Sequence, residues 1–132
     1  MSYVVGVLVK PSGTSGALYQ AGNATAQADA YAAKDENGNT ADRQFRDHHI
    51  TVHSEFIVGA NDPVPVPGDT VTFVGVNAPT VSAAGVVSGT FSVGGTASMA
   101  ARVNGDVSIT TRNTDYVQGS FEAVRDLVNG LP

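Results

Sequence analysis

The sequence predicts an all-β fold: a small antiparallel β-sandwich or barrel with a long hairpin arm and at most one short helix. Apolar and polar residues alternate with a period of two over several segments, and turn residues separate those segments. Apolar residues at helical spacing are scarce. With 132 residues, the chain has the length of one domain with one core. We therefore expect a single β domain over residues 1–132.

The first predicted element is a buried strand at Tyr3–Val9. This run is apolar but stops at Lys10-Pro11, and no basic residue flanks it on the N-terminal side. It is too short for a membrane span or for a typical secretory signal with its cleavage site. We expect no targeting segment here.

Residues 24–46 are expected to form the hairpin arm. Alanine occupies every second position from Ala24 to Ala30, opposed by Thr, Gln and Asp, which is strand alternation. The pair Asn37-Gly38 favours a type I′ turn, with a partner strand over Thr40–Phe45. Alanine is also the best helix former, so a helix over 24–33 stays open as the alternative.

The middle of the chain predicts two strands separated by a proline-rich loop. Residues Ile50–Val58 place Ile50, Val52, Phe56 and Val58 on one side of a strand. The loop over 59–69 contains Pro63, Pro65 and Pro67, which cannot donate a continuous ladder of hydrogen bonds. Pro67-Gly68 suits a turn into a strand at Thr70–Val76.

The last third of the chain predicts further short strands. Candidates are Val86–Val93, ending at Gly94-Gly95, and Thr96–Val103. Asn104-Gly105 predicts a hairpin into the next strand. Residues 106–112 and 116–124 alternate regularly and should pair as an antiparallel ribbon, and 125–130 is expected to be a single helical turn or an extended tail.

The composition excludes several classes of function. Charged residues make up 14% of the chain, against roughly 25% in typical soluble domains. The formal net charge is −5, with only seven Lys and Arg residues. Phosphate binding depends on such cations, so a dedicated nucleic-acid reader is not expected. The chain has no Cys, which removes disulfides, thiolate nucleophiles and sulfur-ligated zinc.

His48, His49 and His53 are the only histidines, and with Asp47 and Glu55 they suggest a metal site. On a strand, however, His49 and His53 share a face about 13 Å apart. Zinc needs nitrogen ligands at about 2.0–2.1 Å, so both cannot bind one ion. We therefore favour the interpretation that the histidines lie on a strand that faces solvent or another subunit.

Enzyme signatures are missing from the sequence. It contains no Gly-x-Ser-x-Gly elbow, P-loop or dinucleotide-binding fingerprint. We expect no enzymatic activity, no catalytic or metal-binding residue and no cofactor.

Charge placement gives a more specific expectation. No Lys or Arg occurs between Asp47 and Ala101, a stretch that contains Glu55, Asp62 and Asp69. This is either a neutral sheet surface covered by Thr and Ser or an acidic face past which a polyanion could move without binding. We expect Glu55, Asp62 and Asp69 to contribute to an acidic face of the second kind.

The order of these features resembles that of virion structural proteins of tailed bacteriophages, most of all tail-tube proteins. The resemblance covers roughly residues 34–125. It comprises the acidic Asn-Gly turn at 34–38, the polar strand at 49–53 and the proline loop. Pro-Gly-Asp-Thr-Val at 67–71 and the run from Asn113 to Ala123 complete it.

The resemblance implies a β subunit that joins a six-fold ring, in rings that stack into a tube conducting DNA. Copies of the chain and other tail proteins would be its partners, DNA would be non-specific passing cargo, and no membrane contact is implied. The protein would be made in the host cytoplasm and act in the phage tail. Contacts between rings would fall at Asn37, Gly38, Pro63, Pro65 and Pro67, and the acidic face would line the lumen. A capsid decoration protein or adhesin-like binding module is the alternative.

Overall fold

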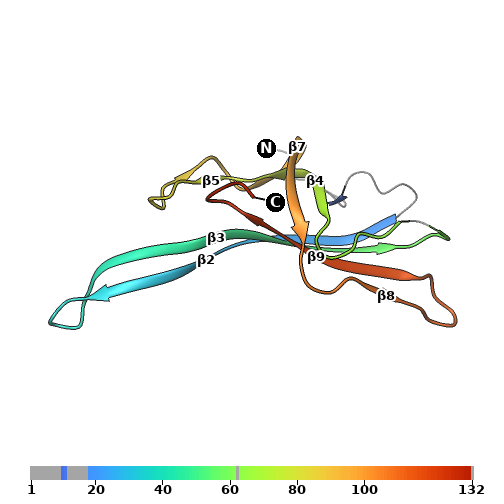
Figure 1. Ribbon diagram of the computed structural model, residues 1–132, viewed down its shortest axis with the longest axis horizontal. Helices are drawn as coiled ribbons and strands as arrows, with labels where there is room; N and C mark the ends of the chain where they lie inside the picture. Colours follow the sequence, from blue (N-terminus) through green and yellow to red (C-terminus); the bar gives the residue numbers. More distant parts are fainter. Residues whose placement is uncertain (1–9, 12–17, 62, 132) are drawn as a thin grey trace.

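The computed structural model describes residues 10–11, 18–61 and 63–131 (Figure 1). The prediction of an all-β fold is confirmed, and the described residues contain no helix, hence none that could cross a membrane. The strands are β1 (Lys10–Pro11), β2 (Leu18–Lys34), β3 (Thr40–Ile57), β4 (Thr70–Asn77), β5 (Thr80–Val81), β6 (Val87–Ser88), β7 (Ser92–Val103), β8 (Ser108–Thr110) and β9 (Gln118–Asp126).

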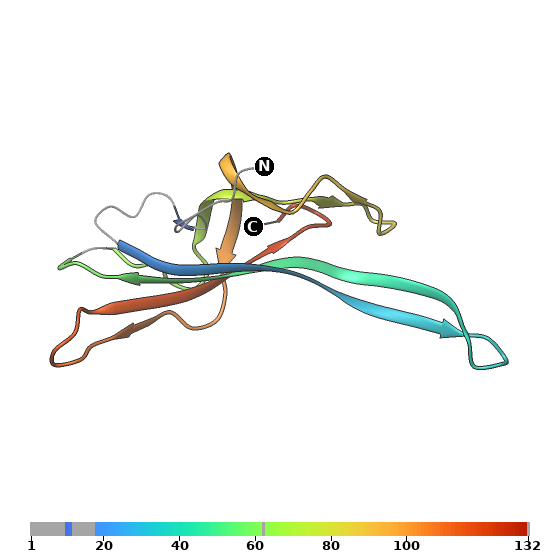
Figure 2. The ribbon, with the colours of Figure 1, turned by 180° about the vertical axis from the view of Figure 1, so that it is seen from behind.

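Seven of these strands form one antiparallel sheet in the order β1-β4-β7-β9-β3-β2, with β8 also paired to β9. The sheet curls into a half-barrel, and β5 and β6 form a separate small hairpin. Figures 1 and 2 show the half-barrel at one side of the molecule and the hairpin of β2 and β3 extending far beyond it. This extension is the predicted hairpin arm.

The core lies on the concave side of the half-barrel, where alternate residues of each strand point inward. On β3, Ile50, Val52 and Phe56 are buried, which confirms the predicted face of this strand. Three aromatic pairs connect the strands: Tyr19 with Phe56, Phe56 with Phe121, and Phe121 with Phe73, at centroid distances of 5.6, 6.0 and 6.2 Å. Edge-to-face and tilted ring pairs at such distances stabilise a core beyond their buried area.

Residues 24–33 form a strand, so the helical alternative is wrong. Each residue from Ala21 to Ala26 lies opposite a β3 residue that is itself paired to β9, for example Ala24 opposite Val52. The long partner strand supplies a continuous ladder, and this tertiary pairing overrides the helix propensity of alanine.

Asn104-Gly105 does not form the predicted hairpin. Both β7 and β8 pair antiparallel with β9, through Arg102 and Val103 on one side of the break and Ser108 to Thr110 on the other. The two strands therefore run in the same direction along one edge of β9. Gly105, with φ of +80°, lets the chain leave the ladder and rejoin it.

Three further predictions need revision. The predicted strand Val86–Val93 is divided between β6 and the start of β7, because Gly89 bends the chain with φ of +88°. Gly94-Gly95 lies within β7 and does not end a strand. After β9 the chain makes bends and no helical turn, and the predicted strand at Tyr3–Val9 lies outside the described residues.

Candidate assembly surfaces

The tip of the arm is a compact turn that contains Asn37 and Gly38. Oδ1 of Asp35 accepts hydrogen bonds from the backbone N–H groups of Asn37 and Asn39, both at 2.9 Å. The N–H of Gly38 donates to the carbonyl of Asp35, and Gly38 has φ of +81°. Asn37 does not have positive φ, so this is a three-residue loop ending in a left-handed glycine rather than the expected type I′ turn.

Residues 29–47 form a two-stranded ribbon that leaves the body of the protein. β9 pairs with β3 only from His49 onward, so the earlier part of β3 has β2 as its single strand neighbour among the described residues. Every residue from 29 to 47 is exposed. An isolated two-stranded hairpin is marginally stable in water at best.

The two faces of the arm differ in chemistry. On the outer face, the guanidinium of Arg46 lies 5.0 Å from the ring centre of Tyr31 and donates a hydrogen bond to Gln44. The other face continues the core side of the sheet, because alternation along β2 carries that side from Ala24 outward. It presents Ala28, Ala30, Ala32 and Phe45, and Phe45 is 49% exposed.

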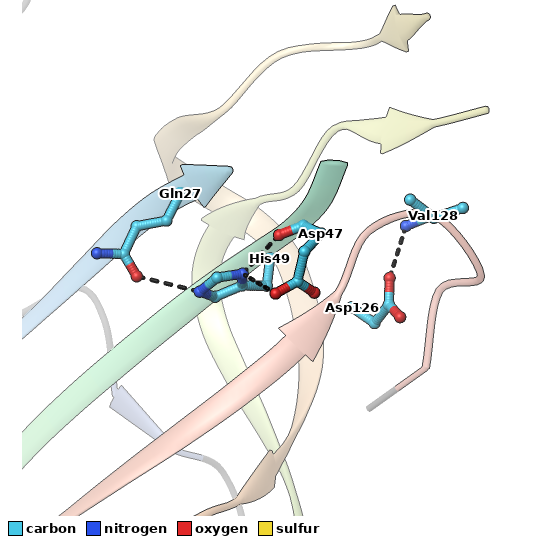
Figure 3. A network of polar contacts seen from close by, with 5 residues as sticks. All are labelled: Gln27, Asp47, His49, Asp126 and Val128. Atoms are coloured by element: carbon cyan, nitrogen blue, oxygen red, sulfur yellow. Dashed lines mark hydrogen bonds and ion pairs between the residues drawn. The ribbon is translucent and has the colours of Figure 1, made fainter. Parts of the chain in front are cut away.

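A polar network holds the root of the arm (Figure 3). Nδ1 of His49 donates to the backbone carbonyl of Asp47 at 2.7 Å, and its Nε2 lies 3.1 Å from Oε1 of Gln27 on β2. Asp47 has φ of +57° and lies in a β-bulge, where two β3 residues oppose Ala28. The imidazole of His49 thus joins β2 to the bulge at the point where the arm leaves the body.

The proline-rich loop begins at the end of the molecule opposite the arm tip and runs back to the body (Figures 1 and 2), where the N–H of Gly68 donates to the carbonyl of Val103. Pro67 and Gly68 form the predicted turn: the N–H of Asp69 donates to the carbonyl of Val66, and Gly68 has φ of +97°. Pro63 and Pro67 are exposed, and Pro65 is half-buried. The residues expected to make contacts between rings therefore lie in two separate regions, the arm tip and the proline-rich loop.

Glu55 lies on the convex face of the sheet, away from the core. Its Oε1 is 3.3 Å from Nε2 of His53, and Nδ1 of His53 is 3.8 Å from Oε1 of Glu122 on β9. The ring of His53 therefore lies between two carboxylates from neighbouring strands. Glu122 is an acidic residue of this face that the sequence analysis did not select, because only the register of β3 and β9 brings it opposite His53.

Asp69 has a different environment from Glu55. Its Oδ2 accepts a hydrogen bond from the backbone N–H of Val66 at 3.0 Å, so the carboxylate closes the turn after the proline loop. Asp62 lies outside the described residues. The structure thus joins Glu55 to Glu122 through His53 and leaves Asp69 with a separate structural contact.

The three histidines do not converge. His48 lines a groove of about 600 Å³ between the arm root and the 82–85 loop, and its Nε2 is buried with no hydrogen-bond partner among the described residues. His49 and His53 lie on the convex side of β3 in separate contacts. Within the described ranges, no group of three or more His, Asp or Glu residues could hold a metal ion.

Exposed apolar side chains lie in several places: on segment 86–93 (Val86, Val87, Phe91 and Val93), at the single positions Val66 and Leu131, and at both ends of the molecule. At the arm end they are Tyr31 and Phe45, and at the other end Ile109 and Tyr116 of the β8–β9 hairpin, which are 55% and 76% exposed. The sequence analysis did not select these residues as contacts. For Tyr31 and Phe45, the sequence did offer a signal: they are two aromatic residues in a segment that otherwise contains mostly alanine and polar residues.

Comparison of the chain with protein-family models, with curated proteins and with solved structures found no match.

Proposed function

We propose that this protein is a structural subunit that assembles with copies of itself into stacked rings, forming a phage tail tube through which DNA passes. The ring, the tube and the DNA cargo come from the resemblance described above. The structural observation that carries the proposal is the arm over residues 29–47. It extends outside the only core of the described residues, and its apolar face is covered only in part, where the 82–85 loop lies across a groove from Phe45.

The arm supports self-assembly for an energetic reason. Holding a residue in an extended conformation costs about 1–2 kcal/mol of backbone entropy, and burial of apolar surface normally offsets this cost. In the single chain, Phe45 is 49% exposed, and Ala30 and Ala32 on the same face are exposed. A neighbouring subunit placed against this face would supply the missing burial.

Two groups of exposed apolar residues are placed so that they could meet head to tail. One group lies on the arm and the other on the β8–β9 hairpin at the opposite end. Contacts between two different surfaces of the same subunit generate rings or open filaments. Stacked rings need contacts of this kind along the tube axis.

The convex face suits a surface along which DNA moves without binding. Glu55 and Glu122 lie on it. No Lys or Arg occurs anywhere between Asp47 and Ala101. Arg102, which alternates with buried Ala101 and Val103 on β7, and Arg46 on the arm lie on the same side of the sheet. Since cations supply the affinity of proteins for the phosphate backbone, the part of this face around Glu55 and Glu122 would bind DNA only weakly. We propose that this face lines the lumen and that the protein acts in the virion without catalysis.

Negative-stain electron microscopy of the purified protein tests the assembly. We expect rings or tubes for the wild-type chain at high concentration. The variant Phe45→Ala should lose them, whereas Phe91→Ala, which truncates an aromatic residue of similar exposure outside the arm, should keep them.

Two results would contradict the proposal. One is a strictly monomeric wild-type protein at the highest concentrations reached, with no ring or tube. The other is a monomer or trimer that binds empty capsids or polysaccharide, which would favour a decoration protein or adhesin-like module.

A further inference from the structure

From Ala21 to Lys34, the outer edge of β2 has no strand paired to it among the described residues. The strand spans 17 residues and pairs with β3 on one side. On its other side no strand lies among the described residues. A free strand edge presents N–H and C=O groups that are ready to pair with another strand.

From Ala21 onward, β2 has few of the features that protect a strand edge. Natural edge strands usually carry proline, several charges or bulges that prevent pairing with other chains. β2 contains no proline, and its charged residues are Asp29 and the final Lys34. From Ala21 to Lys34 the strand is also regular, because both bulges in this stretch place their extra residue on β3.

The free flank of β3 in the arm shows the contrast. Residues 40–48 contain Asp42, Arg43, Arg46 and Asp47, together with the two bulges. This edge therefore has the charges and irregularities that β2 lacks. The difference indicates that the edge of β2 is suited to pairing and the edge of β3 is not.

We propose that β2 pairs with β2 of a second copy of this chain, antiparallel, about a two-fold axis near Ala26. The other short free edges of the described sheet cannot match its length, since β8 has three residues and β1 has two. A second β2 has the same length and twist and the same unprotected edge. Such an interface is isologous, with each copy contributing the same surface.

Charge placement selects the antiparallel arrangement. A parallel pair in register would place each Asp29 beside its copy, at the strand spacing of about 4.8 Å. An antiparallel pair centred on Ala26 places Asp29 opposite Asn23 of the other strand. The two Asp29 residues are then about 20 Å apart along the strands.

This dimer is independent of the proposed tube. It concerns the edge of β2 in the soluble protein, whereas the tube depends on the arm face and on contacts between opposite ends. Electron microscopy can therefore fail to show tubes while the dimer is present, and the dimer can be absent while tubes form.

The lack of cysteine in the chain permits a direct test. Single cysteines are placed at Thr25, Ala26 and Gln27 near the axis, and at Ala21 and Ala32 far from it, all of them exposed positions. Antiparallel neighbours lie with Cα atoms about 4.5–5.5 Å apart, which a disulfide can bridge. We expect mild oxidation to give covalent dimers for at least one position near the axis and for neither distant position.

The control and a second measurement keep the test decisive. Ser108→Cys, on the free edge of β8, should give no covalent dimer on its own. Sedimentation equilibrium of the unmodified protein should show a species of twice 13.5 kDa that dissociates on dilution.

Three results would overturn the proposal. Linkage at every β2 position would indicate a parallel pair. Linkage only when β2 and β8 cysteine variants are mixed would indicate a head-to-tail edge contact. A wild-type protein that is monomeric at all concentrations, together with no linkage in any of the single-cysteine variants near the axis, would exclude the dimer.

Discussion

The half-barrel and the arm share the strands β2 and β3 but differ in what stabilises them. In the half-barrel, β3 has β2 on one side and β9 on the other, and alternate residues such as Val52 and Phe56 are buried. In the arm, β3 loses β9, and Phe45 continues the core side of the sheet, where it is 49% exposed and lines a groove together with the 82–85 loop. The comparison separates residues that stabilise the fold from residues that remain available for other molecules.

The largest effect should come from the core of the half-barrel. Phe73 is fully buried and lies 6.2 Å from Phe121, centroid to centroid. Phe73→Ala should lower the free energy of unfolding by about 3–5 kcal/mol, because it removes apolar contacts and leaves a cavity. Urea denaturation measures the change. A loss below about 1 kcal/mol would mean that the core lies elsewhere.

An overpacking change should have a smaller effect in the same region. A Cβ atom at Gly119 would lie 2.8 Å from Cζ and 2.9 Å from Cε2 of Phe56. Gly119→Ala should therefore cost about 1–3 kcal/mol in denaturation experiments. Gly38→Ala is the matched control, because a Cβ atom at Gly38 would have no atom within 4 Å. Alanine disfavours the positive φ of Gly38, so this variant should disturb the turn at the arm tip and not the core. Equal losses of global stability in the two variants would contradict the division between body and arm.

The root of the arm should respond locally. His49→Ala removes contacts to Asp47 and Gln27, each worth about 0.5–1.5 kcal/mol. Hydrogen exchange should become faster over residues 29–47 while the strands of the body keep their protection. His53→Ala serves as the control, because His53 lies four residues further along the same face of β3. Its exchange in the arm should match that of the wild type.

The smallest effect on stability is expected for the arm face itself. Phe45→Ala should change the free energy of unfolding of the monomer by no more than about 0.5 kcal/mol, as for other exposed positions. The same change should abolish the formation of rings and tubes. A large loss of monomer stability would show that Phe45 belongs to the fold and would weaken its assignment as a contact.

Much of the fold could be predicted from two-residue periodicity. The inward faces of β3 and β9 follow from alternation, since each strand has one buried face. The turn at Pro67-Gly68 also follows, because both residues have specific backbone requirements. The choice between strand and helix over 24–33 could not be made locally. It depends on the partner strand β3, which lies more than twenty residues away along much of its length.

The candidate surfaces were harder to predict, because register determines them. Glu55 was selected from the charge pattern, but its neighbour Glu122 becomes visible only when β3 and β9 are aligned. Asp69 was grouped with Glu55 by charge alone, whereas its carboxylate closes a turn. Likewise, Asn104-Gly105 has the composition of a hairpin turn. The conformation of Asn104-Gly105 depends instead on β7 and β8, which both pair with the same edge of β9.

Hydrogen exchange of the arm as a function of protein concentration tests most directly whether this ribbon completes its burial against other copies. In dilute protein, the amides of residues 29–47 should exchange rapidly, and they should become strongly protected as the concentration rises, while the amides of β4 and β9 keep the same protection throughout. An arm whose exchange rates are identical at every concentration would contradict the account.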